Sequence, residues 1–547
     1  MLGNMQGHAL NVASLIEFAD RCHGDSEIVS RRVEGDLHRT NWNGVAGRAR
    51  RFARWLDAIG TSHGERVATL AWNGYRHLEI YYGVSASGRV LHTLNPRLPL
   101  AQLVWIINDA QDEVVCFDLT FLPLVQAIQS RCPGVRHWVA LCDQDRVTDG
   151  MTAHGIACYE SLIDGFSDAV YSWPSLDENA ASSLCYTSGT TGNPKGVLYS
   201  HRSTVLHAYA VALPDSMNLS ARNAVLPVVP MFHVNAWGLP YSAALTGAKL
   251  VFPGPALDGK SVYELIESES VDLAAGVPTV WQMLLNHVQS NKLRFSTLKR
   301  TIVGGSACPA AMIDAFADDY GVELSHAWGM TELSPLGTVN TLKRKHLALP
   351  KEQQRALRLK QGRPVFGVDL RIVDNDGLDL PQDGASSGEL MVRGPWVVDR
   401  YFKQDHENLD DGWLRTGDIA TLDADGFLQI TDRAKDVIKS GGEWVSSLEI
   451  ESVISRHPGV AEVAVIGIKD EKWGERPVAL VVLKAGTVVT EDEIKQHVME
   501  FATTGRISKY AVPQQVRFVD ALEKTSVGKT NKKWLREQFT SHQESAR

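Results

Sequence analysis

The first clear pattern of hydrophobic positions begins at Trp42. Apolar residues recur from there at steps of three and four, at Val45, Ala49, Phe52, Ala53, Leu56 and Ile59. This spacing places them on one face of a helix, and Gly60 follows as a typical terminator. The pattern therefore predicts an amphipathic helix that begins at Trp42 and ends at Gly60.

Short apolar runs then alternate with helical stretches. Residues 66–72 and 90–94 favour strands, and residues 77–88 between them follow a helical period. Two further strands are expected at 113–118 and 138–142. Strand, helix and strand with short connections are typical of a parallel sheet covered by helices. The first part of the chain is thus predicted to be built of α/β layers.

Two later strands end in small residues. Residues 273–278 and 301–306 each form a short apolar run, and the second closes on Gly304, Gly305 and Ser306. Open α/β sheets hold nucleotides just beyond the carboxyl ends of their strands. These three residues are therefore candidates for packing against adenine, although a plain tight turn has the same composition.

The C-terminal part follows a different pattern. Turn sequences at 374–377 and 423–426 lie between strand-like runs and predict a small β-rich layer. After them, residues 446–449 have the composition of a capping box at the start of a helix. Residues 460–483 contain two expected strands, and residues 491–501 an expected helix. The last hundred residues are predicted to form a compact α+β unit.

A basic stretch at 342–361 separates these parts. It alternates leucines with cations, namely Lys343, Arg344, Lys345, Lys351, Arg355, Arg358 and Lys360. We interpret it as a solvated amphipathic helix. A docking site for the phosphates of CoA is the alternative.

Composition and charge exclude several classes of protein. The 547 residues include 55 basic and 64 acidic side chains, which gives a net charge of −9. Such a chain does not bind nucleic acid or an anionic membrane by bulk electrostatics. The seven cysteines show no metal-ligand spacing, and we expect them to be buried thiols in a reducing compartment.

No segment predicts export or a membrane span. The N-terminus lacks a basic region followed by an apolar core. The most apolar region, residues 224–255, is interrupted by Pro227, Pro230, His233, Asn235, Pro240 and Lys249. We therefore expect a cytoplasmic protein without a membrane span.

The candidate chemistry starts at residues 186–197, Tyr-Thr-Ser-Gly-Thr-Thr-Gly-Asn-Pro-Lys-Gly-Val. Glycines allow backbone amides to approach phosphate oxygens, hydroxyls donate hydrogen bonds, and Lys195 supplies a cation. The Walker pattern is excluded because Lys195 follows Pro194 rather than glycine. A polyphosphate-binding loop is favoured over a flexible surface loop.

A second candidate for a binding site lies at residues 231–238. Two aromatic residues, His233 and Asn235 stand in an apolar setting that suits the mouth of a pocket for a molecule with one polar end. From residue types alone, a core segment with one satisfied histidine is equally acceptable.

Several motifs together resemble the adenylate-forming superfamily, which includes acyl-CoA synthetases, luciferases and the adenylation domains of peptide synthetases. Besides the loop at 186–197, they are His-Ala-Trp-Gly-Met-Thr-Glu at 326–332, Asp-Gly-Trp-Leu-Arg-Thr-Gly-Asp at 411–418, Asp-Arg-Ala-Lys-Asp at 432–436 and Lys-Thr-Ser-Val-Gly-Lys at 524–529. Two positions depart from the usual pattern. Trp328 stands where tyrosine is more common, and Lys524 near a position that is more often proline.

The resemblance implies an α/β fold in two domains. Residues 1–433 would form a large N-terminal domain of layered α/β sheets with a small β-rich subdomain, which binds ATP and the acyl group. Residues 434–547 would form a small mobile α+β domain, with the hinge at Lys435.

It also implies roles for individual residues. Those expected at ATP or AMP are Thr187, Ser188, Gly189, Thr190, Thr191, Lys195, Gly304, Gly305, Ser306, Ala327, Trp328, Gly329, Met330, Thr331, Asp418, Arg433 and Lys529. The acyl group would lie against His233, Trp237 and Gly329. CoA would contact Lys439, Ser440, Gly441, Gly442, Glu443 and Trp444. Thr187 and Glu332 would hold Mg²⁺, and the catalytic residues would be Lys529, Thr331, Glu332 and His233.

The implied reaction is that of an ATP-dependent acyl-CoA ligase, an acid–thiol ligase. A carboxylic acid would react with ATP to an acyl-adenylate and then with CoA, and the small domain would rotate between the two steps. We also expect a homodimer.

The chain looks most similar to bacterial medium- and long-chain fatty-acid ligases and to 3-methylmercaptopropionate-CoA ligases. The expected acid is 3-methylmercaptopropionate or a short- or medium-chain fatty acid, with a long-chain acid as the alternative. An adenylation module that loads a carrier protein and an inactive AMP-binding protein are rivals from other classes.

Overall fold

The computed structural model describes the chain except for residues 2, 188–192, 375, 406–408, 441–442, 471, 505–506, 525–529 and 546–547. The chain divides into two compact units. The first unit contains residues 1–369 and 393–414, and the second contains residues 370–392 and 415–547.

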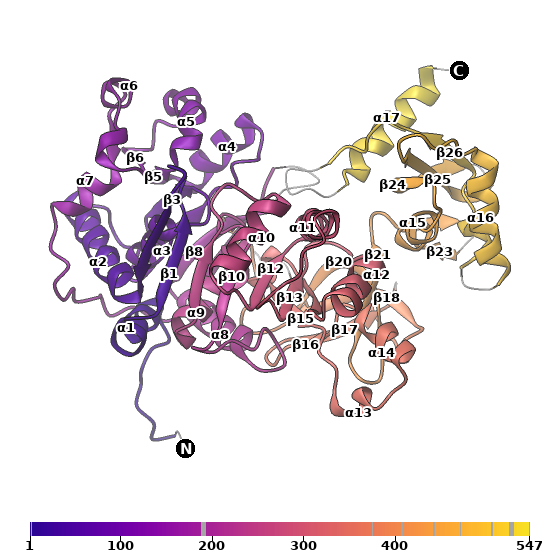
Figure 1. Ribbon diagram of the computed structural model, residues 1–547, viewed down its shortest axis with the longest axis horizontal. Coiled ribbons are helices and arrows are strands. Elements are labelled where there is room, and N and C mark those ends of the chain that lie inside the picture. Colours follow the sequence, from indigo (N-terminus) through magenta and orange to yellow (C-terminus); the bar gives the residue numbers. More distant parts are fainter. Residues whose placement is uncertain are drawn as a thin grey trace. The chain divides into compact units, whose positions relative to one another are not determined.

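One sheet of the first unit has the strand order β7-β6-β5-β3-β4-β8-β9 (Figure 1). Its strands are β3 (Arg66–Leu70), β4 (Val90–Thr93), β5 (Asp112–Phe117), β6 (His137–Ala140), β7 (Ile156–Cys158), β8 (Ala181–Tyr186) and β9 (Gly196–Ser200). Neighbouring strands are parallel except for the hairpin of β8 and β9. The predicted parallel α/β layer is confirmed.

Helices cover this sheet. They are α1 (Val12–His23), α2 (Trp42–Ala58), α3 (Tyr75–Ser85), α4 (Leu100–Ala110), α5 (Leu122–Ile128), α6 (Asp149–Ala153) and α7 (Tyr159–Asp164). The predicted helix from Trp42 is α2, which begins after the cap Asn41, whose side chain accepts a hydrogen bond from the Gly44 amide. Its apolar face packs against α3, which is buried along its whole length.

A second sheet of the same unit has the order β16-β15-β14-β13-β12-β10-β11-β1-β2. Its strands are β1 (Glu27–Arg31), β2 (Leu37–Asn41), β10 (Ala224–Pro227), β11 (Lys249–Phe252), β12 (Leu273–Gly276), β13 (Arg300–Val303), β14 (Glu323–Gly329), β15 (Leu336–Val339) and β16 (Arg363–Pro364). The helices that follow along the chain in this unit are α8 (His201–Ala212), α9 (Leu239–Thr246), α10 (Gly259–Ser268), α11 (Pro278–Ser290), α12 (Ala310–Asp314), α13 (Arg344–Leu347) and α14 (Lys351–Arg358).

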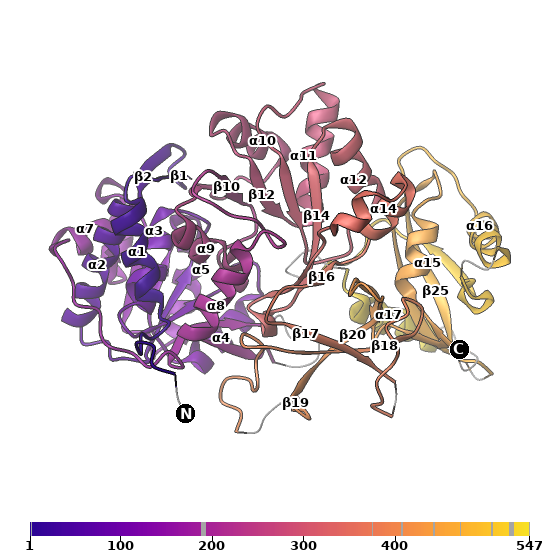
Figure 2. The same cartoon turned by 90° about the horizontal axis from the view of Figure 1, so that it is seen from below.

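A small antiparallel sheet follows in the chain. Its strands are β17 (Asp369–Val373), β18 (Ser387–Arg393), β19 (Leu409–Asp410), β20 (Trp413–Leu422) and β21 (Leu428–Arg433) (Figure 2). The turn at 423–426 joins β20 and β21 through a hydrogen bond from the Asp423 amide to the Phe427 carbonyl. The predicted β-rich layer is therefore present.

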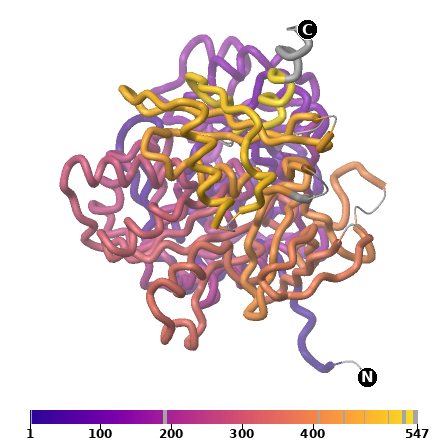
Figure 3. Tube along the Cα trace, turned by 90° about the vertical axis from the view of Figure 1, so that its right-hand side faces the viewer, coloured from indigo at the N-terminus to yellow at the C-terminus, as the bar shows by residue number. Residues whose placement is uncertain are grey.

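The remaining part of the second unit is an α+β layer of its own. The strands are β22 (Ile438–Ser440), β23 (Glu443–Val445), β24 (Val460–Asp470), β25 (Gly474–Leu483) and β26 (Gln515–Phe518). This stretch of the chain is orange to yellow in the Cα tube of Figure 3. The helices are α15 (Ser447–Ile454), α16 (Glu491–Thr503) and α17 (Lys532–Ser545). Apolar residues of β24, β25, α15 and α16 share one buried cluster, so this layer has its own core.

Three sequence-based expectations need correction. The basic stretch is two short helices, α13 and α14, because the residue before Pro350 is biased away from helical geometry. No residue of α14 is buried, in agreement with a solvated face. Cys22 is exposed and Cys308 half-buried, whereas the other cysteines are buried; all seven are free thiols. The expected capping box at Ser446 shows only the bond from the Glu449 amide to the serine hydroxyl.

Among the described residues, no helix combines the length and the apolar character needed to cross a bilayer.

Candidate active site

Most of the candidate residues in the first unit follow the carboxyl ends of neighbouring strands. In the second sheet, β10 lies between β11 and β12, so the chain crosses from one side of β10 to the other. This is a topological switch point, where open α/β sheets bind ligands. The segment with His233 follows β10, and Gly304 to Ser306 follow β13. The fold thus brings these separate segments to one edge.

The phosphate-loop candidate is the connection between β8 and β9. Tyr186 and Gly196 lie opposite each other in the hairpin, and the Thr187 amide donates to the Lys195 carbonyl over 2.9 Å. The Lys195 amide in turn lies 3.3 Å from Thr187 Oγ1. These bonds close the neck of the loop, so Thr187 and Lys195 are held side by side. The predicted residues Ser188, Gly189, Thr190 and Thr191 lie outside the described residues.

Lys195 and Glu332 meet around one aromatic ring. Lys195 Nζ lies 4.6 Å from the centroid of the Tyr401 ring, a cation–π contact. The Tyr401 hydroxyl donates a 2.8 Å hydrogen bond to Glu332 Oε1. Tyr401 therefore holds a cation and a carboxylate in fixed relation. Sequence reasoning missed this residue, which stands 69 positions after Glu332.

Backbone contacts fix the neighbouring residues. The Tyr199 hydroxyl donates to the Thr331 carbonyl over 2.6 Å, and the Val398 amide donates to the Glu332 carbonyl over 2.8 Å. Thr331 and Glu332 are each only 8% exposed. The position of the carboxylate is thus set by the main chain as well as by Tyr401.

The His233 segment lines a small cavity. Phe232, His233 and Val234 face Thr93, Leu94, Asn95, Leu98, Ile106, Cys185 and Tyr186 across it. Asn235 is buried behind them and donates to Ser183 Oγ over 3.1 Å. Most of the side chains that line the cavity are apolar, and His233 adds an imidazole to them.

The backbone beyond His233 forms a left-handed turn. Val234, Asn235, Ala236 and Trp237 have φ between 47° and 58°, and Gly238 follows at 77°. Such a run costs roughly 1 to 2 kcal/mol for each non-glycine residue. It turns the Trp237 indole toward Gly304, where an added Cβ would lie 3.0 Å from the ring. The acyl-site candidate Trp237 and the nucleotide-site candidate Gly304 are therefore in contact.

Close approach explains two further residues of the 326–332 motif. An added Cβ at Gly329 would lie 2.0 Å from the Pro335 carbonyl oxygen, so only glycine fits. The Trp328 ring packs on Gly337 and is 8% exposed. Ala327 pairs with Val339 in the antiparallel ladder, which places Met330 at the strand end.

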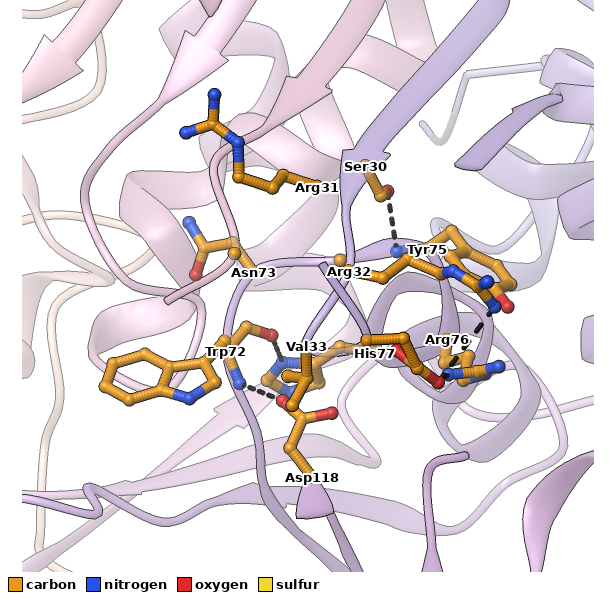
Figure 4. A pocket seen from close by; sticks show the side chains of 13 residues that line it. Ser30, Arg31, Arg32, Val33, Trp72, Asn73, Tyr75, Arg76, His77 and Asp118 are labelled. Carbon is orange, nitrogen blue, oxygen red and sulfur yellow. Dashed lines mark hydrogen bonds and ion pairs between the residues drawn. The ribbon is translucent and has the colours of Figure 1, made fainter. Parts of the chain in front are cut away.

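Asn73 supports the His233 segment from the first sheet. Its side-chain amide donates to the carbonyls of Pro227 and Val229, both over 2.8 Å, and its oxygen accepts from the Met231 amide. Asn73 belongs to the turn after β3, which lines a depression together with Arg76 and Asp118 (Figure 4). Burial raises the pKa of Asp118 to about 7. Sequence reasoning missed Asn73, because no local pattern marks it.

In the second unit, Asp418 and Arg433 lie opposite each other on β20 and β21. Arg433 Nε is 2.9 Å from Asp418 Oδ1, and the aspartate is only 2% exposed. Lys435 follows two residues later and is exposed. The predicted pair of ribose ligands is thus held together by its own charges.

The predicted CoA segment spans the hairpin of β22 and β23. Lys439 pairs with Trp444 and Ser440 with Glu443, and the Lys439 amide donates to Glu475. Gly441 and Gly442 lie outside the described residues, as does Lys529. Ser440 is completely buried, and its hydroxyl has no partner among the described residues.

Two of the candidate residues carry oxygen atoms of the kind that a hard cation prefers. Mg²⁺ is usually held by one or two carboxylates together with phosphate oxygens and water. Glu332 and the Thr187 hydroxyl offer such oxygens. Among the described residues, no group of three or more His, Cys, Asp and Glu side chains could hold a metal ion by itself.

The chain belongs to the AMP-binding enzyme family. The AMP-binding enzyme domain matches residues 17–402, and the AMP-binding enzyme C-terminal domain matches residues 449–529. The predicted membership of the adenylate-forming superfamily and the class of an AMP-forming acid–thiol ligase are confirmed. ATP and CoA are accordingly substrates of this enzyme class.

Two similar proteins are CoA ligases. The 3-methylmercaptopropionyl-CoA ligase of Ruegeria lacuscaerulensis is 52% identical over 541 residues, which is 98% of this chain and 99% of that protein. The medium-chain-fatty-acid–CoA ligase of Ectopseudomonas oleovorans is 50% identical over 98% of both chains. The crystal structure of the anthranilate CoA ligase AuaEII in complex with anthranoyl-AMP superposes with a TM-score of 0.84 at 24% identity, over 98% of this chain and 99% of that chain. This structural similarity supports the fold alone.

Proposed function

We propose that this enzyme couples 3-methylmercaptopropionate, or a fatty acid of short or medium length, to CoA with cleavage of ATP to AMP and diphosphate. The observation that carries the proposal is the fixed arrangement of Lys195, Tyr401 and Glu332 beside the carboxyl ends of the strands. The activities for which the two similar ligases are named support the choice of acid.

The chemical need explains these residues. A carboxylate becomes reactive when it attacks the α-phosphate of ATP and displaces diphosphate, but two anions must meet for this step. Lys195 would neutralise the outer phosphates, and the Thr331 hydroxyl would bind the α-phosphate. Glu332 and Thr187 would hold Mg²⁺, which supplies charge neutralisation when bound.

The acid would occupy the cavity beside His233. The buried Trp237 indole closes the space next to Gly304, which supports a small acid rather than a long chain. Gly329 would border the carboxylate. Ala327, Trp328, Met330, Gly305 and Ser306 would surround the adenine and its sugar phosphate.

The two half-reactions would use different residues. In the first, Lys529 would bridge the incoming carboxylate and the α-phosphate, while Asp418 and Arg433 would bind the ribose. After adenylation, rotation at Lys435 would withdraw Lys529 and bring the segment 439–444 to the pantetheine arm. We propose residues 1–433 and 434–547 as the two moving parts, and a cytoplasmic homodimer as the working form.

An assay of AMP release with ATP, CoA and a panel of acids tests this function. The panel runs from short to long fatty acids and includes 3-methylmercaptopropionate. We expect AMP and acyl-CoA in equal amounts, with the highest kcat/KM for 3-methylmercaptopropionate or a short or medium acid. A maximum at long chains would favour the alternative substrate. Absence of AMP with every acid, or AMP formation that needs a carrier protein instead of CoA, would contradict the proposal.

A further inference from the structure

His207 lies between two segments of the first unit that carry candidate site residues. It belongs to α8 and is only 2% exposed. On one side is Gly238, which ends the left-handed turn after His233, and an added Cβ there would lie 2.6 Å from His207 Nδ1. On the other side is Leu336, whose backbone amide donates to His207 Nε2 over 3.2 Å. The imidazole therefore contacts both the segment proposed for the acid and the strand that follows the 326–332 motif.

The contact with Gly238 is reinforced from α9, which packs beside α8 (Figure 1). The Ser242 hydroxyl lies 3.0 Å from the Gly238 carbonyl oxygen and 3.2 Å from that of Ala208, so it joins the turn to α8. Gly238 has a φ of 77°, and a Cβ at this position would clash with the imidazole. The end of the turn is therefore fixed against His207.

Leu336 is held at both of its backbone groups. His207 accepts from its amide, and the Trp396 indole donates to its carbonyl oxygen over 3.0 Å. The two aromatic rings also meet edge to face, with their centroids 5.9 Å apart. Since a backbone amide left without an acceptor in such a buried position is costly, the imidazole is needed to keep this strand in place.

Leu336 in turn sets the position of the nucleotide motif. It pairs with Gly329 in the antiparallel ladder. The carbonyl of the residue before Leu336 accepts a hydrogen bond from the Met330 amide over 3.1 Å. The turn that carries Thr331 is thus connected to His207 through a single short strand.

We propose that His207 is a positioning residue that keeps the acid and the α-phosphate of ATP at reacting distance. The inference rests on the proposed function, in which the acid lies beside His233 and the α-phosphate at Thr331. Because the Leu336 amide donates to Nε2, this nitrogen carries no proton, and the imidazole is the neutral tautomer with its proton on Nδ1. His207 acts through the two segments that it separates.

The two half-reactions depend on this spacing to different degrees. In adenylation the acid and ATP are separate molecules, so the rate depends on how well the two parts of the site align them. In thioester formation the acyl group and AMP are already joined, and the covalent bond itself sets their relative position. Loss of the His207 contact should therefore slow adenylation much more than thioester formation.

His207→Leu tests this directly, because it keeps a buried apolar side chain but removes the acceptor for the Leu336 amide. We expect kcat of ATP–diphosphate exchange to fall by about 10- to 100-fold, with KM for the acid nearly unchanged. Thioester formation from supplied acyl-AMP and CoA should stay near the wild-type rate. His207→Gln offers a side-chain oxygen in place of Nε2 and should restore most of the exchange rate.

His201 on the same helix provides the matched control. It is fully buried, and its Nδ1 accepts from the Val12 amide over 3.2 Å, a bond of the same kind that holds α1 instead of the site. His201→Leu should lower the thermal unfolding temperature but leave the ratio of the two half-reaction rates unchanged. Trp396→Phe keeps an aromatic ring and loses the donor to the Leu336 carbonyl, so it should show the split of His207→Leu to a smaller degree.

Several results would overturn the inference. Equal loss of both half-reactions in His207→Leu would indicate damage to the fold alone, and wild-type exchange in that variant would show that the spacing does not depend on the imidazole. His207→Gln as impaired as His207→Leu would exclude the acceptor role. If His207→Leu does not fold, wild-type exchange in Trp396→Phe decides against the inference. All variants are compared on the acid that the wild-type enzyme uses best, so a different preferred acid would correct the proposed substrate without affecting this test.

Discussion

The two units hold their functional side chains in different ways. In the first unit, Glu332 is fixed by Tyr401 and by main-chain hydrogen bonds. In the second unit, the candidate ribose ligands Asp418 and Arg433 hold each other through an ion pair, and Asp436 pairs with Arg536 in the same way. A buried hydrogen bond to a ring hydroxyl or to the main chain keeps one geometry, whereas an ion pair with a partly exposed partner can exchange partners at small cost. The carboxylate of the first unit is therefore held more firmly than the charged pairs of the second.

The largest expected contrast is the response to acid. Burial lowers the pKa of His77, His201 and His326 to about 4 and that of His207 to about 3, all in the first unit. Histidines that are neutral when folded bind protons on unfolding, so their stabilisation is present above the ordinary pKa of about 6.5 and is lost as the pH falls toward 4. The four histidines amount to about 6 kcal/mol between pH 6.5 and 5, of which the raised pKa of Asp118 offsets about 2 kcal/mol.

Two buried carboxyls of the second unit have the opposite sign, as Asp118 has in the first unit. Burial raises the pKa of Asp432 and Glu451, so these carboxyls bind protons more readily when folded. Their contribution to stability therefore increases as the pH falls through the raised pKa. Pulse proteolysis at pH 7.5 and pH 5, with fragments identified by mass, should show the first unit cut much earlier at pH 5. Earlier loss of the second unit would contradict this.

The next effect is expected at Glu332. Glu332→Gln keeps the shape and an acceptor for the Tyr401 hydroxyl but removes the negative charge. We expect adenylation to fall by about 3 kcal/mol, roughly 100-fold, because one preorganised electrostatic contact is lost. ATP–diphosphate exchange measures this, and a matching thermal unfolding temperature shows that the fold is intact. Near wild-type exchange at all Mg²⁺ concentrations would exclude the role.

A smaller effect is expected in the charge network of the second unit. Lys532 is 2.7 Å from both Glu451 and the Ser447 hydroxyl, and its side chain is 10% exposed. Lys532→Met leaves a buried carboxylate unpaired and should destabilise this unit by about 2 kcal/mol, less than for a fully buried pair. The exposed neighbour Lys533 provides the matched control, since Lys533→Met should change stability by less than about 0.5 kcal/mol. Equal effects of the two substitutions would contradict the comparison.

The smallest effect is expected from Tyr401→Phe. The ring under Lys195 remains, and only the hydrogen bond to Glu332 is lost. A hydrogen bond to a charged group contributes about 1.5 kcal/mol, so kcat/KM for ATP should fall about tenfold. A loss as large as that of Glu332→Gln would mean that Tyr401 does more than orient the carboxylate.

Local pattern was enough to predict much of this fold. The period of three to four residues from Trp42 predicted α2, and short apolar runs predicted β12 and β13, although these strands end at Gly276 and Val303 rather than at residues 278 and 306. The helix buries one face and the two strands are buried along their length, and both kinds of burial leave a local pattern of apolar residues in the sequence.

Features that depend on distant partners were not predictable. Tyr401 and Asn73 contribute through contacts with residues far away in the chain, so no local signal marks them. The left-handed turn from Val234 to Trp237 opposes the local backbone preference of every residue in it, and only the surrounding packing stabilises it. The break at Pro350 did have a local signal, the proline itself, which the amphipathic pattern obscured.

The proposed role of Lys529 in adenylation alone is tested most directly by measuring the rates of the two half-reactions separately in Lys529→Ala. ATP–diphosphate exchange with the acid should fall by about 3 to 4 kcal/mol, or 100- to 1,000-fold, while thioester formation from supplied acyl-AMP and CoA stays near the wild-type rate. Lys524→Ala, which loses only a surface pair with Glu462, should keep both rates. Exchange near the wild-type rate in Lys529→Ala, or equal loss of both half-reactions, would contradict the assignment.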